Sequence, residues 1–125
     1  MKTILVVDDD RNLRRLYKEE LEAEGYRIAL ATNGRQALDF ICREKPDLIV
    51  MDIRMPEMDG LEAMVRILRE HGQMPVILNT AYSSYQDNFL TWAADGYLIK
   101  SSELEPLKEK IKEVLQPRGP IPNAA

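Results

Sequence analysis

This 125-residue chain lacks several features that would define a class of protein. It has a single cysteine, Cys42, which excludes an internal disulfide and fits a reducing compartment. Its 17 basic residues are outnumbered by 21 acidic ones and are scattered among them, so direct nucleic-acid binding is not expected. No apolar run approaches the length of a membrane span, and the first strand-like segment begins almost at Met1. We therefore expect a cytoplasmic protein with no signal peptide and no membrane contact.

The length fits one compact domain, in which strand-like and helix-like segments alternate five times. Short apolar runs predict strands at 3–7, 26–31, 47–52, 75–80 and 96–100, and the weaker run at 26–31 has the alternation of an edge strand. Helical periodicity predicts helices at 12–25, 35–44, 59–72, 81–94 and 102–115, with caps at Asp59 and near Ser102. This order predicts an α/β fold whose mostly parallel sheet is covered by helices on both faces. The domain is expected to span 1–116, with the proline-rich stretch 117–125 as a flexible tail or the start of a linker.

Polar side chains follow four of the five predicted strands. Asp8 and Asp9 follow the first strand and Asp52 ends the third, while Thr80 and Lys100 end the last two. Ligands of parallel sheets bind beyond the carboxyl ends of the strands, so we expect these side chains to meet at one edge. A carboxylate at the exit of a buried strand is costly to keep charged unless a cation or hydrogen-bond donors lie close to it.

These carboxylates form an all-oxygen set that fits a hard divalent cation, and magnesium is the cofactor we expect. Lys100 adds a fixed positive charge and Thr80 adds a hydroxyl donor. Phosphoryl transfer to an aspartate requires such a set: a carboxylate nucleophile and several groups that stabilise charge on the equatorial oxygens.

Over nearly its whole length the chain resembles the receiver domain of bacterial two-component response regulators. The resemblance rests on motifs that occur in order: the acid pair after the first strand, Met51-Asp52-Ile53-Arg54-Met55-Pro56 followed by Asp59-Gly60, Thr80-Ala81, and Tyr97 before Lys100. It implies a flavodoxin-like, doubly wound (βα)5 fold with strand order 2-1-3-4-5. It also implies a phosphorylation-dependent signalling switch and not a metabolic enzyme.

The resemblance further assigns a role to each site residue. Asp52 would accept a phosphoryl group from the phosphohistidine of a sensor histidine kinase or from a phosphotransfer protein. Thr80 and Lys100 would bind the phosphoryl oxygens. Magnesium would be held by Asp8, Asp9, Asp52 and the backbone carbonyl of Arg54.

The same resemblance implies how the switch works. Thr80 would move toward the phosphoryl group, and the ring of Tyr97 would turn inward. The surface formed by the predicted fourth helix, the last strand and the last helix would then change. It would regulate a downstream protein or an output domain, or support a phosphorylation-dependent homodimer.

The sequence departs from the family pattern after Lys100. The family usually has a proline there, often after a cis bond, whereas this chain has Ser101. Because a cis bond without proline costs roughly 2.5–4 kcal/mol, a trans bond is predicted. Arg54 and Tyr82 occupy positions at which the family tunes the lifetime of the phosphoryl group through water access. Both side chains are bulky, which predicts a longer-lived phosphoryl state.

Three other functions fit the sequence less well. A receiver-like binding module that is not phosphorylated would leave the intact set of site residues without a use. A phosphatase of the haloacid dehalogenase type would have a second aspartate where Arg54 stands. A flavin or nucleotide carrier would have a Ser/Thr/Gly-rich loop after the first strand, where Asp8-Asp9-Asp10 would repel phosphate.

Overall fold

Five parallel strands form the centre of the computed structural model, which describes residues 1–116. The predicted tail at 117–125 lies outside the described residues. The sheet has the order β2-β1-β3-β4-β5, which confirms the predicted strand order. The strands are β1 (Thr3–Val7), β2 (Arg27–Ala31), β3 (Leu48–Met51), β4 (Val76–Thr80) and β5 (Gly96–Ile99).

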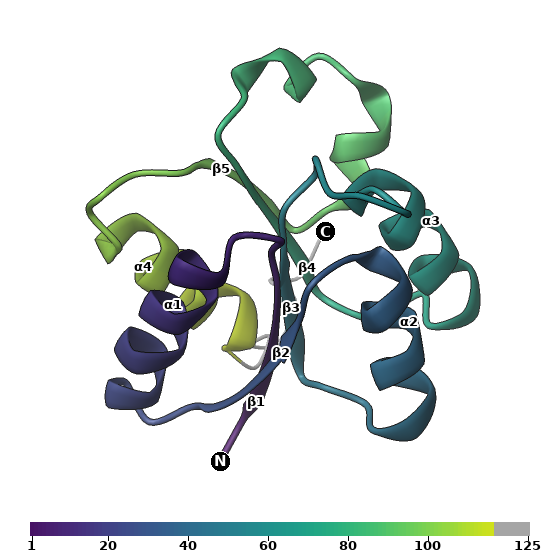
Figure 1. Ribbon diagram of the computed structural model, residues 1–125. Coiled ribbons are helices and arrows are strands. Elements are labelled where there is room, and N and C mark those ends of the chain that lie inside the picture. Colours follow the sequence, from purple (N-terminus) through teal and green to yellow (C-terminus); the bar gives the residue numbers. More distant parts are fainter. Residues whose placement is uncertain (117–125) are drawn as a thin grey trace, which may run out of the picture.

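Helices cover both faces of the sheet, as predicted (Figure 1). On one face lie α1 (Arg11–Ala23) and α4 (Glu105–Leu115), and on the other lie α2 (Gly34–Arg43) and α3 (Gly60–Glu70). The central strands are buried on both faces because alternate side chains enter two separate cores. In β1, for example, Leu5 and Val7 pack against the α2–α3 layer, whereas Ile4 and Val6 pack against the α1–α4 layer. The edge strand β2 is only partly buried, as its weaker pattern predicted.

Short polar side chains set the starts of three helices. Asp59, a predicted cap, accepts a hydrogen bond from the Glu62 N–H at 2.8 Å at the start of α3. Asp10 caps α1, and Asn33 caps α2 in the same way. The loops after β1 and β3, which carry predicted site residues, therefore each lead into a capped helix. The caps help to fix the paths of these two loops.

The predicted helix at 81–94 is wrong. That segment forms two short 3₁₀ turns, η1 (Ser83–Tyr85) and η2 (Phe89–Ala93), which lie at the top of Figure 1 between β4 and β5. The Asn88 side chain accepts a hydrogen bond from the Leu90 N–H at 2.9 Å, and the Thr91 hydroxyl donates to the Asn88 carbonyl at 2.7 Å. Local bonds of this kind compete with the α-helical pattern and divide the segment into turns.

Two smaller predictions about the helices are also wrong. The last helix begins at Glu105, three residues after the expected cap near Ser102, and its N-cap residue Leu104 makes no side-chain cap bond. The helical spacing of Leu13, Leu16, Tyr17 and Leu21 predicts that all four lie on the core face of α1, but Leu16 is 38% exposed. The bond between Lys100 and Ser101 is trans, as predicted, since residues 1–116 contain no cis peptide. None of the helices in that range is both long and apolar enough to cross a membrane.

Candidate functional site

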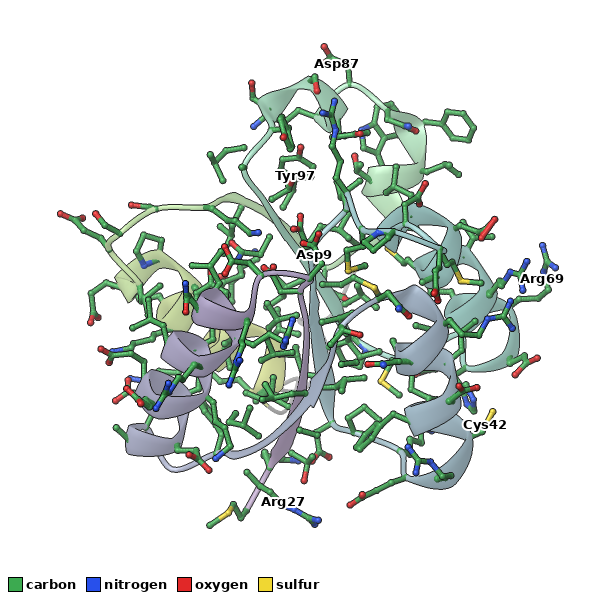
Figure 2. The ribbon with its side chains drawn as sticks, viewed as in Figure 1. Asp9, Arg27, Cys42, Arg69, Asp87 and Tyr97 are labelled. Carbon is green, nitrogen blue, oxygen red and sulfur yellow. The ribbon has the colours of Figure 1, made fainter. Side chains whose placement is uncertain are left out.

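The carboxyl ends of β1 and β3 bring two of the predicted site residues together. Val7 and Met51 are paired in the register of these neighbouring strands, so Asp8 and Asp52 leave the sheet side by side. The Asp52 N–H donates to the Val7 carbonyl at 2.9 Å, which continues the ladder by one bond. Asp9 lies in the turn that follows and sits at the upper end of the sheet in Figure 2.

Three carboxylates and one ammonium form the centre of the site. Asp8, Asp9 and Asp52 each offer a carboxylate oxygen, and these oxygens lie within 4.8 Å of one another. The Lys100 Nζ lies 2.8 Å from an oxygen of Asp8 and 2.8 Å from an oxygen of Asp52. Asp8 and Asp52 are only 2% and 6% exposed, whereas Asp9 faces solvent. The single lysine thus offsets only part of the negative charge that these carboxylates carry when ionised.

The electrostatics of the site reflect this crowding. Burial raises the pKa of Asp8 above its usual value, although the hydrogen bond and charge of Lys100 offset part of the rise. Burial alone lowers the pKa of Lys100, but its hydrogen bonds to Asp52 and Asp8 and their charges outweigh burial and raise the pKa. The ammonium therefore stays charged throughout the physiological pH range.

The donor set fits a magnesium ion. Three carboxylate oxygens within reach of one another, with no thiol or imidazole among them, are hard ligands that suit Mg²⁺. One of them belongs to the exposed Asp9, so the site is open to solvent on one side. An open side is compatible with the several waters that Mg²⁺ usually keeps when carboxylates bind it.

Thr80 and Tyr97 lie at the same edge of the sheet, and both form hydrogen bonds with Tyr82 in the loop after β4. Thr80 is fully buried, and its hydroxyl accepts a hydrogen bond from the Tyr82 N–H at 3.4 Å. Tyr97 is half-buried against the core, and its hydroxyl donates to the Tyr82 carbonyl. Figure 2 shows Tyr97 above Asp9, beneath the loop that carries Asp87. Among residues 1–116, no hydrogen bond joins either side chain to the acidic cluster.

The sequence interpretation missed two contributors to the site. A Cβ atom on Gly60 would lie 1.9 Å from the carbonyl oxygen of Asp52, so this position admits only glycine. The Asp59-Gly60 motif marks this position in the sequence, but no local pattern signals the close approach to Asp52. Tyr85 was not singled out at all, although its hydroxyl accepts a hydrogen bond from Arg54 Nε at 2.9 Å. It stands in the segment expected to be helical, where nothing in the sequence marks a contact 31 residues away.

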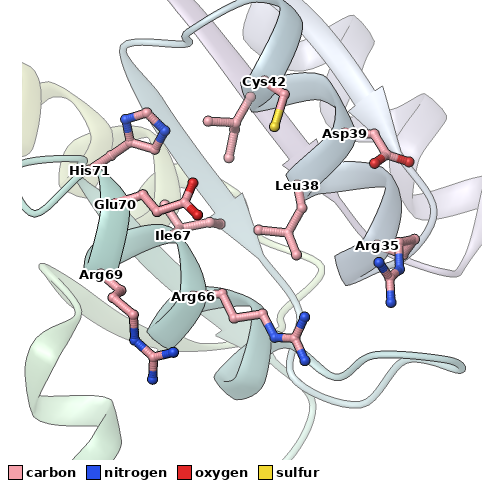
Figure 3. Close-up of a pocket in the computed structure, with 10 residues that line it drawn as sticks. Arg35, Leu38, Asp39, Cys42, Arg66, Ile67, Arg69, Glu70 and His71 are labelled. Carbon is pink, nitrogen blue, oxygen red and sulfur yellow. The ribbon is translucent and has the colours of Figure 1, made fainter.

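A hollow of about 420 Å³ lies away from this site, between α2 and α3 (Figure 3). Its apolar floor includes Leu38 and Ile67, and Arg35, Arg66 and Arg69 stand around it. None of its lining residues belongs to the acidic cluster.

The fold and the site together define an α/β protein with an acidic pocket at the carboxyl edge of a doubly wound sheet. The model of the response regulator receiver domain matches residues 4–112. The chain therefore belongs to the response regulator receiver domain family, whose members act in two-component signalling and are not enzymes in the classical sense.

Several curated relatives are longer than this chain. The response regulator MprA of Mycolicibacterium vanbaalenii is 38% identical over 119 residues, which cover 94% of this chain and 52% of that protein. The regulatory protein AtoC of Escherichia coli is 38% identical over 115 residues, which cover 90% of this chain and 25% of that protein. The chain thus spans about half, or less, of the length of these relatives.

Solved structures agree with the assignment. The response regulator TrrA of Thermotoga maritima, crystallised in complex with Mg²⁺-BeF, matches with a TM-score of 0.90 and 47% identity over 92% of this chain and 100% of that one. TrrA in complex with the histidine kinase ThkA matches with a TM-score of 0.88 and 46% identity over 93% of this chain and 100% of that one. A CheY-like receiver from Methanospirillum hungatei is 34% identical with a TM-score of 0.87, over 92% of this chain and 94% of that one.

Proposed function

We propose that this chain is a phosphorylation-dependent switch that accepts a phosphoryl group on Asp52 in a magnesium-dependent reaction. The observation that carries the proposal is the position of the Asp52 carboxylate, which is buried and held by Lys100 beside two further acids. A structural ion pair with Lys100 would need only one carboxylate. A phosphoacceptor with a bound divalent cation would use all three, because the two further acids help to hold the cation. TrrA, which was crystallised with Mg²⁺-BeF and with a histidine kinase, gives independent support.

The residues divide the chemistry among them. An oxygen of Asp52 would attack the phosphorus atom while the bond from phosphorus to the donor's histidine nitrogen breaks and the imidazole leaves. The Ile53 N–H donates to Asp52 Oδ1 at 2.7 Å, while Lys100 holds Oδ2, so the carboxylate is fixed in orientation before the donor arrives. Magnesium, held by Asp8, Asp9, Asp52 and the Arg54 carbonyl, would supply positive charge to the phosphoryl oxygens. Lys100 would then move from the carboxylates to the phosphoryl group.

Phosphorylation would change the loop that follows β4. The new group brings roughly -1.5 to -2 charge and three acceptor oxygens. The Thr80 hydroxyl now accepts only a long bond from its own loop and would turn to donate to the phosphoryl group. The Tyr82 carbonyl in that loop also accepts a hydrogen bond from the Tyr97 hydroxyl. A movement of Thr80 would therefore shift the partner of Tyr97 on β5. The changed surface would comprise the η1–η2 segment, β5 and α4. Within η2, the side chain of Trp92 is 77% exposed.

This surface would contact a downstream protein, an output domain or a second copy of the chain. The phosphoryl donor would be a sensor histidine kinase or a phosphotransfer protein. We place the receiver domain at 1–116, which contains the whole family match, with 117–125 as a tail or as a link to a further segment.

Intact-mass spectrometry tests the proposal directly. The protein is incubated with acetyl phosphate, with and without Mg²⁺, beside Asp52→Ala. We expect one phosphoryl group to be added in the presence of Mg²⁺, and none to be added to the variant. If neither acetyl phosphate nor a phosphohistidine donor adds a group, the chain is a receiver-like binding module that is not phosphorylated.

A further inference from the structure

The backbone of Asp8, at the exit of β1, is held by a side chain from α1. The Nη1 atom of Arg14 donates a hydrogen bond to the Asp8 carbonyl oxygen at 2.6 Å. Arg14 lies near the start of α1 and is partly buried, whereas Arg11 and Arg15 on the same helix are exposed. Because a guanidinium stays charged at every physiological pH, this hydrogen bond is charge-assisted. The start of α1 therefore reaches back to the first acid of the cluster.

The other polar groups of Asp8 are engaged as well. Its N–H donates to the Ala31 carbonyl at 3.1 Å. One of its carboxylate oxygens accepts a hydrogen bond from the Asp10 N–H at 2.9 Å, and the other lies 2.8 Å from the Lys100 Nζ. The bond from Arg14 completes this set, so Asp8 is held by four different residues.

Asp9, in contrast, is exposed, and its carboxylate forms no hydrogen bond or ion pair within residues 1–116. Its position follows from the residues on either side of it. The peptide unit between Asp8 and Asp9 is planar, so the Asp8 carbonyl and the Asp9 N–H and Cα move together. On the other side, Asp10 is held as the N-cap of α1. The bond from Arg14 to the Asp8 carbonyl therefore limits where the Asp9 carboxylate can lie.

We propose that Arg14 is a positioning residue that holds the Asp8 carbonyl and thereby keeps the Asp9 carboxylate within reach of the other two acids, which strengthens Mg²⁺ binding. The inference rests on the proposed function, because it concerns the same metal site. The Asp9 carboxylate lies within 4.8 Å of those of Asp8 and Asp52 although no partner of its own holds it there. Without the bond from Arg14, Asp9 would have to become ordered as the ion binds, and the lost conformational entropy would weaken the affinity.

Electrostatics alone would give the opposite result. The Arg14 guanidinium carries a positive charge close to the acidic cluster, and a positive charge repels an incoming cation. If charge were its only influence, removing the guanidinium would tighten Mg²⁺ binding, and replacing it by another cation would change little. Positioning predicts weaker binding in both cases. The sign of the change in affinity therefore separates the two explanations.

The Kd for Mg²⁺, measured on the full chain from amide NMR shifts as MgCl₂ is added, tests this role. Arg14→Lys keeps the charge, but its side chain ends one bond short of the Nη1 atom, and Arg14→Gln removes the charge and the reach together. We expect both variants to bind Mg²⁺ about three- to tenfold more weakly, the range that one charge-assisted hydrogen bond supports. Arg15→Lys and Arg15→Gln are the matched controls on the exposed side of the same helix and should keep the native Kd.

A double-variant cycle shows whether the effect passes through Asp9. In an Asp9→Asn background, Arg14→Lys should weaken Mg²⁺ binding no further, because the carboxylate that it positions is gone. An unchanged Kd in Arg14→Lys, tighter binding in Arg14→Gln, or an equal weakening in the Asp9→Asn background would overturn the inference.

The same samples separate this inference from the proposed function. If the native protein binds Mg²⁺ with the expected dependence on Arg14 but takes up no phosphoryl group from acetyl phosphate or a phosphohistidine donor, the proposed function fails and the positioning role stands. If the native protein shows no Mg²⁺-dependent shifts, both the metal site and the positioning role are refuted.

Discussion

Replacing Lys100 by methionine should destabilise the protein in a way that depends on pH. Lys100→Met keeps most of the side-chain length but leaves Asp8 and Asp52 buried without their cation. Breaking a buried ion pair by removing one partner costs about 3–5 kcal/mol. Lys100 is 16% exposed and its neighbour Asp9 faces water, so we expect a loss near or below that range, about 2–3 kcal/mol at about pH 7 without magnesium.

The pH dependence follows from Asp8. Its pKa is raised in the folded protein, so the stability linked to its protonated form is complete below its ordinary pKa and is lost as pH rises through the raised value. Lys100 stabilises the ionised form of Asp8, so it reduces this loss of stability only at pH values at which Asp8 is ionised. Its removal raises the pKa of Asp8 further. The stability deficit of Lys100→Met should therefore be largest near neutral pH and shrink as acidification protonates Asp8.

Urea unfolding followed by circular dichroism measures both effects. With typical slopes, the expected deficit lowers the midpoint by about 1–2 M urea near neutral pH. Lys112→Met is the matched control, because Lys112 is 62% exposed and lies 3.8 Å from its partner Glu24. This control should lose less than about 0.5 kcal/mol. A Lys100→Met midpoint equal to that of the control, or a deficit that grows as pH falls, would refute the reasoning.

Three further predictions concern the backbone, the core and the metal. Gly60→Ala should cost about 3 kcal/mol or more in urea unfolding because its Cβ would meet backbone at 1.9 Å, whereas Gly72→Ala, with 3.5 Å of space, should be tolerated. Destabilisation by Tyr17→Phe should be about 1–3 kcal/mol, because the buried Asn79 amide loses its 3.0 Å partner, and adding Asn79→Leu should recover part of the loss. Magnesium at ten times its Kd should stabilise the protein by about 1.4 kcal/mol in thermal unfolding, and Asp9→Asn should remove most of this gain. Equal behaviour of the two glycine variants, a neutral Tyr17→Phe, or an undiminished magnesium effect in Asp9→Asn would each contradict its prediction.

The strands and the acidic cluster were predictable because their signals are local. A buried parallel strand is an apolar run, and β1, β3 and β4 begin and end within one residue of their predicted bounds. Parallel strands all place their carboxyl ends at one edge, so the residue type that follows each strand is enough to place Asp8, Asp9, Asp52 and Lys100 together. The cap at Asp59 is local in the same sense.

The segment between β4 and β5 shows where local signals fail. The spacing of its apolar residues is compatible with a helix. However, the Asn88 side chain accepts a hydrogen bond from the Leu90 N–H and forms a local turn, and Phe89 and Trp92 stay exposed. The start of the last helix was misplaced for a related reason. The Ser101 hydroxyl accepts a hydrogen bond from Glu103 N–H in the loop, and the helix begins only after Leu104.

The sequence by itself thus determined the alternation of elements, the sheet edge that carries the site and the carboxylates that meet there. The tertiary structure decided which hydrogen bonds and ion pairs those carboxylates form and which side chains surround the site. The hydrogen bond from Asn79 to Tyr17 spans 62 residues, and the bond from Arg54 to Tyr85 spans 31 residues. Such contacts leave no periodic trace along the chain, because they depend on strand register, loop path and rotamer, which packing of the whole domain sets.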